Sequence, residues 1–182
     1  MNLIKRFFLK KQKEKEYKQY IDNHKIDILK AFYEMMECKE LESLIYDPDI
    51  LSPLWYRALE HDDSKYEKPE FNAYRKHYNP IDKQEKIDSW HEYLKAREHH
   101  YQVNDHHWQY RQDWIDSDLT IDTKLICLET VLDWMATGYR FHNRPYEYYE
   151  KHKDKIKLPS KQRKFIEKII YEGVDKKYVE HK

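Results

Sequence analysis

Residues 123–141 read TKLICLETVLDWMATGYRF, the most apolar stretch of this 182-residue chain. Apolar side chains recur in it every three or four positions, a spacing that predicts a helix with one buried face. The positions concerned are Leu125, Leu128, Val131, Leu132 and Met135. Glu129 and Asp133 lie one turn apart on the same helix. Burying a carboxylate costs free energy unless it has a partner, so Asp133 is predicted to serve as a ligand itself.

Upstream of this helix, the segments also have helical periodicity. From Tyr17 onward an apolar stripe runs through Tyr17, Tyr20, Ile21, His24, Ile28, Phe32 and Met35. His24 therefore lies inside an apolar face, either as a metal ligand or as a satisfied core histidine. The segment SPLWYRALEHDD, residues 52–63, is predicted to start a helix with Ser52 as its cap and Pro53 in its first turn.

Three more helices follow the same rules. One covers residues 68–78 and ends at Asn79-Pro80, and its inward positions are Phe71, Tyr74 and Tyr78. A longer one starts near Asp82, and its inner face is predicted to run from Trp90 through Arg97 and His100 to Tyr101. If the helix continues unbroken, Asn104 and His107 extend this face. The last covers residues 158–170 with Ser160 as its cap.

The chain shows no sustained alternation of period two, no internal repeat and no second domain. We therefore predict an all-α, single-domain helical bundle over residues 17–172. Residues 1–16 form a charged extension or the start of a helix, and residues 173–182 form a tail.

Composition narrows the function classes. The 34 basic and 34 acidic residues cancel, which argues against an extended nucleic-acid surface and against a membrane partner. Mean hydropathy is −1.13, which would suit a disordered chain, but an aromatic content of 15% indicates a folded core. The chain has only two glycines, too few for a glycine-rich phosphate loop. Its two cysteines lie far apart in the sequence, which argues against a zinc site built from cysteines. The low cysteine content is typical of a protein in the reducing cytoplasm.

The basic stretch KRFFLKKQKEKEYK, residues 5–18, could contact an acidic partner or a membrane surface. Its interspersed glutamates favour a solvated helix end instead. No apolar run in the chain is long enough to cross a bilayer or to act as a signal peptide.

Histidines gather in the middle of the chain. Seven of the 11 histidines lie from His61 to His107. Five of these seven are in two short stretches, HDDSK (residues 61–65) and HHYQVNDHH (residues 99–107), and the other two lie between the stretches. Imidazoles and carboxylates together suit manganese, cobalt, nickel, zinc or iron better than calcium. A transition metal with an open position lowers the pKa of bound water and generates hydroxide near neutral pH.

The order of His24, the His61-Asp62 pair, the histidines of residues 99–107 and Asp133 resembles the HD-domain superfamily of metal-dependent phosphohydrolases. The resemblance implies an HD-like helical fold in which the first metal is held by His24, His61, Asp62 and Asp133. It implies that His100, with His106 or His107, holds a second metal or the substrate phosphate.

A closer resemblance covers most of the chain. The motifs HDxSKxxxxEFxxY, HHxxxNxHH and DWxxxG are similar to those of an uncharacterised bacterial and phage family of unknown function. The resemblance implies that one site contains His61, Asp62, Ser64, Lys65, Glu70, His100, Asn104, His106, His107 and Asp133. Lys65, at the position of HD-x-x-K, and Arg140 are predicted to stabilise phosphoryl charge, with Arg144 as a further clamp.

Other residues are predicted to support these ligands. Glu70 either orients them through hydrogen bonds or acts as a base. Ser64, Asn104 and Glu129 are predicted to hold ligands in place or to contact substrate.

The predicted function is hydrolysis of a nucleotide or related small phosphoester by one or two divalent transition-metal ions. The expected location is the cytoplasm of a bacterium or phage-infected host, with a homo-oligomer possible. Two alternatives remain open. One is an HD-type di-iron oxygenase, and the other is a non-catalytic phage-type protein that binds a nucleotide signal or a host factor.

Overall fold

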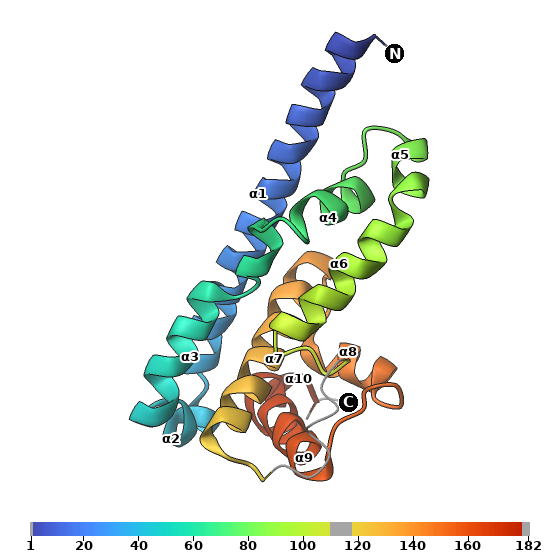
Figure 1. The fold of residues 1–182 in the computed structure, drawn as a ribbon. Coiled ribbons are helices and arrows are strands. Elements are labelled where there is room, and N and C mark those ends of the chain that lie inside the picture. The colour runs from blue at the N-terminus through green and yellow to red at the C-terminus, as the bar shows by residue number, and fades with distance from the viewer. Residues whose placement is uncertain (1, 110–117, 180–182) are drawn as a thin grey trace. The chain divides into compact units, whose positions relative to one another are not determined.

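Every regular element in the described part of the chain, residues 2–109 and 118–179, is a helix (Figure 1). This is a computed structural model. The α-helices are α1 (Leu3–Met36), α2 (Glu42–Ile45), α3 (Pro48–Glu60), α4 (Phe71–Tyr78), α5 (Lys83–Asp88), α6 (Trp90–Val103), α7 (Ile121–Phe141), α8 (Pro145–His152), α9 (Ser160–Lys168) and α10 (Lys176–Val179). Among the same residues, η1 (Lys39–Leu41) and η2 (Asp63–Tyr66) are 3₁₀ helices, and η4 (Ile169–Val174) is a π-helix. The predicted all-α, single-domain class is confirmed.

Contacts divide this domain into two compact units. Unit 1 consists of residues 1–23 and 62–104, and unit 2 consists of residues 24–61 and 105–182. The boundary between Asn23 and His24 falls inside α1, so this helix contributes its first part to unit 1 and its second part to unit 2.

Helix α7 is the centre of unit 2. It packs against α3, α8 and α9 (Figure 1). Its predicted apolar face is buried, with Leu128, Val131 and Leu132 at 0% exposure. The helix ends where His142 adopts a left-handed φ of 54°. The carbonyl of Asn143 then passes so close to Gly138 that a Cβ there would collide with it. The glycine of the DWxxxG motif is therefore required by this turn.

Unit 1 has an aromatic core. Tyr17 from α1, Tyr74 from α4 and Tyr93 from α6 are all at most 7% exposed. The Tyr74 and Tyr93 rings pack edge to face with centroids 5.6 Å apart, a favoured aromatic geometry. The abundance of aromatic residues thus supplies core packing in this unit.

The start of α3 differs from the prediction. The helix begins at Pro48, and the Asp47 side chain caps it by accepting a hydrogen bond from the Asp49 amide at 2.9 Å. The prediction of Ser52 as cap was wrong because Asp47-Pro48 is an equally good cap and first-turn pair five residues earlier. Pro53 consequently lies inside the helix.

Other helix boundaries also differ from the predicted ones. The helix predicted from Asp82 is interrupted at Ser89, between α5 and α6, and α6 ends at Val103. The prediction that Asn104 and His107 continue its face was therefore wrong. Trp90 and Arg97 on α6 are exposed, as is Tyr78 at the end of α4.

Helix α1 begins at Leu3, so residues 3–16 form its first turns. The predicted domain limits at residues 17 and 172 stay predictions. Within residues 2–109 and 118–179, no helix combines the length and the apolarity that a membrane span requires.

Candidate metal centre

Unit 2 contains a cluster of histidines and carboxylates that we call the Asp133 cluster. Its members come from α1, the end of α3, the segment after α6, and α7. They are His24, His61, His106, His107, Glu129 and Asp133. Helical spacing places Glu129 and Asp133 on one side of α7, as the sequence predicted.

Glu129 organises two of the histidines. Its Oε1 atom lies 2.8 Å from His61 Nδ1 and 3.2 Å from His106 Nδ1. An ionised carboxylate only accepts hydrogen bonds, so the Nδ1 atom of each ring carries a hydrogen and donates it. The two rings stack with centroids 4.4 Å apart.

Arg57 holds the other side of Glu129. Its Nε donates to Glu129 Oε2 at 2.6 Å, and its guanidinium also pairs with Asp105. Glu129 is only 4% exposed. Burial raises the pKa of its carboxyl, but hydrogen bonds from His106 and His61 outweigh burial and hold that pKa well below its ordinary value. Glu129 is therefore a charged acceptor at neutral pH.

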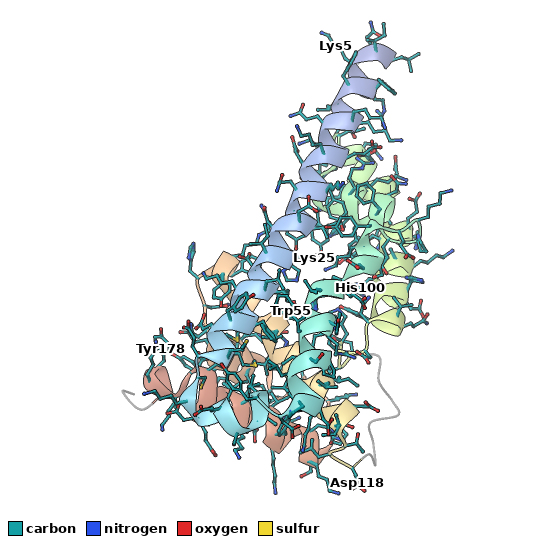
Figure 2. The ribbon with its side chains drawn as sticks, turned by 90° about the vertical axis from the view of Figure 1, so that its left-hand side faces the viewer. Lys5, Lys25, Trp55, His100, Asp118 and Tyr178 are labelled. Carbon is teal, nitrogen blue, oxygen red and sulfur yellow. The ribbon has the colours of Figure 1, made fainter. Side chains whose placement is uncertain are left out.

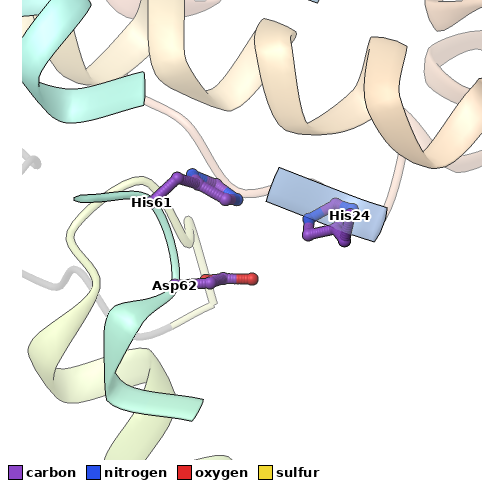
Figure 3. A group of neighbouring side chains, drawn as sticks. All are labelled: His24, His61 and Asp62. Carbon is purple, nitrogen blue, oxygen red and sulfur yellow. The ribbon is translucent and has the colours of Figure 1, made fainter. Parts of the chain in front are cut away.

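Asp133 faces the other ends of two rings. Its Oδ1 atom lies 3.2 Å from His24 Nε2 and 3.7 Å from His61 Nε2. The rings of His24 and His61 are 5.4 Å apart (Figure 3). Burial raises the pKa of Asp133, and hydrogen bonds from His24 and His61 lower it far more, so the group is ionised.

His106 and His107 belong to this cluster as well. One ligand atom each from His106, His107 and Asp133 lies within 4.8 Å of the others, and the same holds for His61, His106 and Glu129. His106 is buried and His107 is partly exposed. The backbone carbonyl of His106 accepts a hydrogen bond from the Thr130 hydroxyl at 2.8 Å, which ties this segment to α7.

Unit 1 contains a second cluster with a similar plan, which we call the Glu70 cluster. Its members come from the segment 62–70 and from the end of α6. They are Asp62, Ser64, Lys65, Glu70, His99, His100 and Asn104. Figure 2 labels His100 on α6.

Glu70 in this cluster has the role of Glu129 in the other. Its side chain is 0% exposed. Its Oε2 accepts a hydrogen bond from His100 Nδ1 at 2.9 Å, and its Oε1 accepts one from His99 Nδ1 at 2.8 Å. Burial raises the pKa of Glu70, and hydrogen bonds from His100 and His99 lower it to a net value below the ordinary one. These contacts favour the orienting role predicted for Glu70 over the role of a base.

The side-chain amide of Asn104 connects two segments of the cluster. Its Nδ2 donates to Ser64 Oγ at 2.8 Å and to the His100 carbonyl at 2.9 Å. Ser64 and Asn104 thus connect the HDxSK motif to the HHxxxNxHH motif, as the resemblance implies.

Asp62 lies beside the second ring nitrogen of His100. Its Oδ1 is 3.2 Å from His100 Nε2, and its Oδ2 pairs closely with Lys65 Nζ. Burial lowers the pKa of His100, but the negative charge of Asp62 outweighs burial and the net pKa is raised. Asp62 follows His61 directly in the chain (Figure 3), and a shared metal with His61 stays a prediction from the sequence.

Asp62 also has an unusual backbone conformation, with a left-handed φ of 59°. This region is costly for residues that carry a Cβ, although Asp and Asn tolerate it better than most. The bend lies between α3 and η2, at the His61-Asp62 pair.

We expect Asp62→Gly to be more stable than Asp62→Ala by about 1 kcal/mol, because both lose the carboxylate and only Ala keeps the Cβ strain. Chemical denaturation of the two variants measures the difference. The pair Lys18→Gly and Lys18→Ala, at an exposed position inside α1, should show the opposite order by about 1 kcal/mol. The same order at both positions would contradict a strained Asp62.

The predicted phosphate clamps differ in their surroundings. Arg140 lies two turns after Asp133 on α7, with an exposed side chain 5.8 Å from the Phe141 ring centre. Arg144 instead donates to Asp175 at 2.7 Å and to Glu34 at 3.2 Å, which gives it a structural role in unit 2.

Two contributors were not singled out from the sequence. Arg57 precedes His61 by four residues on α3, so helical spacing could have identified it. His99 was grouped with the other histidines, and its contact with Glu70 depends on tertiary structure.

The donor chemistry of the Asp133 cluster fits a divalent transition-metal ion. Imidazole nitrogens with one carboxylate are ligands that zinc, iron, nickel and manganese share. The Nδ1–H groups of His61 and His106 are held by a second carboxylate, as is usual for metal-binding histidines. Three or four such ligands leave coordination positions for water.

Comparison with known proteins identifies a family but no activity. No curated protein and no solved structure matches the chain. A family of unknown function, DUF5662, matches residues 13–172, which span both units and both clusters. Membership in the HD superfamily is not shown by this match. The chain belongs to the DUF5662 family.

Proposed function

We propose that this protein is a metal-dependent phosphohydrolase that acts on a nucleotide or a related small phosphoester. One observation carries the proposal: Glu129 Oε1 accepts hydrogen bonds from both His61 and His106, so one buried carboxylate fixes the orientation of two imidazoles whose ligand atoms lie in possible metal-binding groups. The order of the motifs and their resemblance to HD phosphohydrolases support the choice of reaction.

In the proposed site, His24, His61 and Asp133 hold the first ion. A bound divalent ion supplies water activation near neutral pH. His106 and His107 complete the ligand set or contact the phosphate. Glu129 and Arg57 keep the rings in position, and the ionised Asp133 offsets the charge of the cation.

The Glu70 cluster provides a second set of ligands. His100 Nε2 and Asp62 hold a second ion or position the phosphoryl group, and Glu70 orients His100. Lys65, which pairs with Asp62, supplies a cation that stabilises developing negative charge on phosphoryl oxygens.

The test starts with elemental analysis of wild-type protein purified without chelator or metal-affinity tag. We expect about one or two equivalents of manganese, cobalt, nickel or zinc per chain. We also expect phosphate release from at least one member of a panel of nucleoside phosphates and simple phosphoesters. Asp122→Asn, an exposed change at the start of α7, serves as a control that retains both properties.

Three outcomes would overturn this function. A wild type that contains no metal and takes up none of the added ions rules out both enzyme hypotheses. Bound iron with oxygen consumption and no phosphate release supports the oxygenase. Tight nucleotide binding without turnover supports a sequestering protein.

A further inference from the structure

The first two turns of α1 carry an exposed apolar face. Leu3, Ile4, Phe7 and Phe8 are 85%, 65%, 57% and 66% exposed. Positions i, i+1, i+4 and i+5 lie on one side of a helix, so these four side chains form a continuous strip, which we call the N-terminal apolar strip. Figure 2 shows this end of the helix, marked by Lys5. Most other exposed large apolar residues, such as Ile26 and Tyr56, stand apart from one another in the sequence.

Basic residues surround this strip. Residues 1–13 contain five, at positions 5, 6, 10, 11 and 13, and no acidic residue. The whole chain has zero net charge, but its first 13 residues are strongly basic. The neighbouring acids are few and form exposed ion pairs, such as Lys11–Glu14 at 2.9 Å and Arg6–Asp82 at 3.5 Å. Such pairs are weak and exchange readily with other anions.

We infer that the first turns of α1 bind the surface of an anionic lipid bilayer. An apolar strip with aromatic and aliphatic side chains, bordered by lysine and arginine, is the composition of helices that lie in the membrane interface. The phenylalanines would enter the boundary between headgroups and acyl chains, and the basic side chains would contact lipid phosphates. Binding of this kind is peripheral, which agrees with the lack of a spanning helix among the described residues.

A second copy of the chain fits this face less well. Two such strips in contact would bring their basic residues together, and the resulting repulsion opposes association. Four side chains also provide a small area compared with the roughly 800 Å² per partner of a stable protein interface. This inference is independent of the proposed metal chemistry, and it reverses the expectation from net charge that no membrane is involved.

Vesicle co-sedimentation of the full chain tests the inference. We expect binding to vesicles of phosphatidylglycerol and phosphatidylcholine, little binding to pure phosphatidylcholine, and weakening as salt rises. Phe7→Ser with Phe8→Ser should reduce the partition coefficient about 100-fold, because two buried aromatic rings are lost. Lys10→Glu with Lys11→Glu should reduce it by at least about 10-fold.

Ile26→Ser is the matched control, since Ile26 is 62% exposed on the same helix outside the strip, and it should bind like wild type. All these changes are at exposed positions, and circular dichroism confirms that the variants stay folded. Failure of wild type to bind anionic vesicles at low salt would overturn the inference, as would undiminished binding of the double phenylalanine variant. Sedimentation analysis that shows a dimer lost in this variant would assign the strip to a second copy instead.

Discussion

Replacing Glu129 by Gln is expected to weaken transition-metal binding by about 10- to 100-fold while the protein remains folded. Glu129 Oε1 accepts from Nδ1 of both His61 and His106, whereas a glutamine oxygen is a weaker acceptor without negative charge. Its amide group also faces Arg57, another donor, in place of the oxygen that Arg57 now contacts at 2.6 Å. Both rings then lose the partner that fixes their tautomer and their orientation.

Competition with a chromogenic chelator measures the affinity of wild type and Glu129→Gln for zinc and manganese. Glu34→Gln is the matched control, because Glu34 also accepts from an arginine in unit 2 but contacts no histidine in the cluster. The control should bind metal like wild type. Equal affinity in Glu129→Gln and wild type would show that Glu129 does not orient metal ligands.

The same variant has a second readout in the metal-free protein. The pKa of Glu129 is lowered by folding, so its contribution to stability is present above its ordinary value of 4.5 and is lost as pH falls below it. Thermal unfolding between pH 6 and pH 3, values chosen to bracket about 4.5, should therefore be less acid-sensitive in Glu129→Gln than in wild type. An unchanged pH dependence would mean that the histidine contacts do not stabilise the folded state.

The helical class could be predicted because it depends on the spacing of apolar residues along the chain. The face of α7 is the clearest case, since its predicted core positions are buried. Helix ends were predicted less well. Asp47-Pro48 and Ser52-Pro53 are both suitable starts for α3, and sequence spacing alone does not decide between them. The break at Ser89 was also not predicted, although serine is a residue type that often precedes a helix.

The residues of the candidate site could be predicted by type, but their partners could not. Motif order identified His24, His61, Asp62 and Asp133 as one group of ligands. The structure places Nε2 of His24 and of His61 3.2 Å and 3.7 Å from Asp133 Oδ1. The sequence did not show that Glu70 and Glu129 each accept hydrogen bonds from Nδ1 of two histidines, because those contacts join segments up to 68 residues apart. It also did not separate His106 and His107 from His100, which belong to different compact units.

Replacing Asp133 by Asn should abolish metal binding at the Asp133 cluster and, with it, the proposed phosphohydrolase activity. Asn has nearly the same shape, so the change removes charge and little volume. Oδ1 of Asp133 is the atom that both His24 Nε2 and His61 Nε2 approach, and its carboxylate is ionised. A neutral amide is a poor ligand for a divalent transition metal, so the loss in affinity should exceed the roughly 10- to 100-fold expected for an orienting residue.

Elemental analysis, chelator competition and phosphate release measure this change against Asp122→Asn, which lies on the same helix at an exposed position. In the metal-free state, Asp133→Asn should also be less stable than wild type by about 1–3 kcal/mol, because two imidazoles lose a charged partner. Two separate readouts therefore come from one substitution. Full metal content together with full turnover would exclude Asp133 as a ligand, whereas lost metal with retained turnover would show that hydrolysis does not depend on this ion.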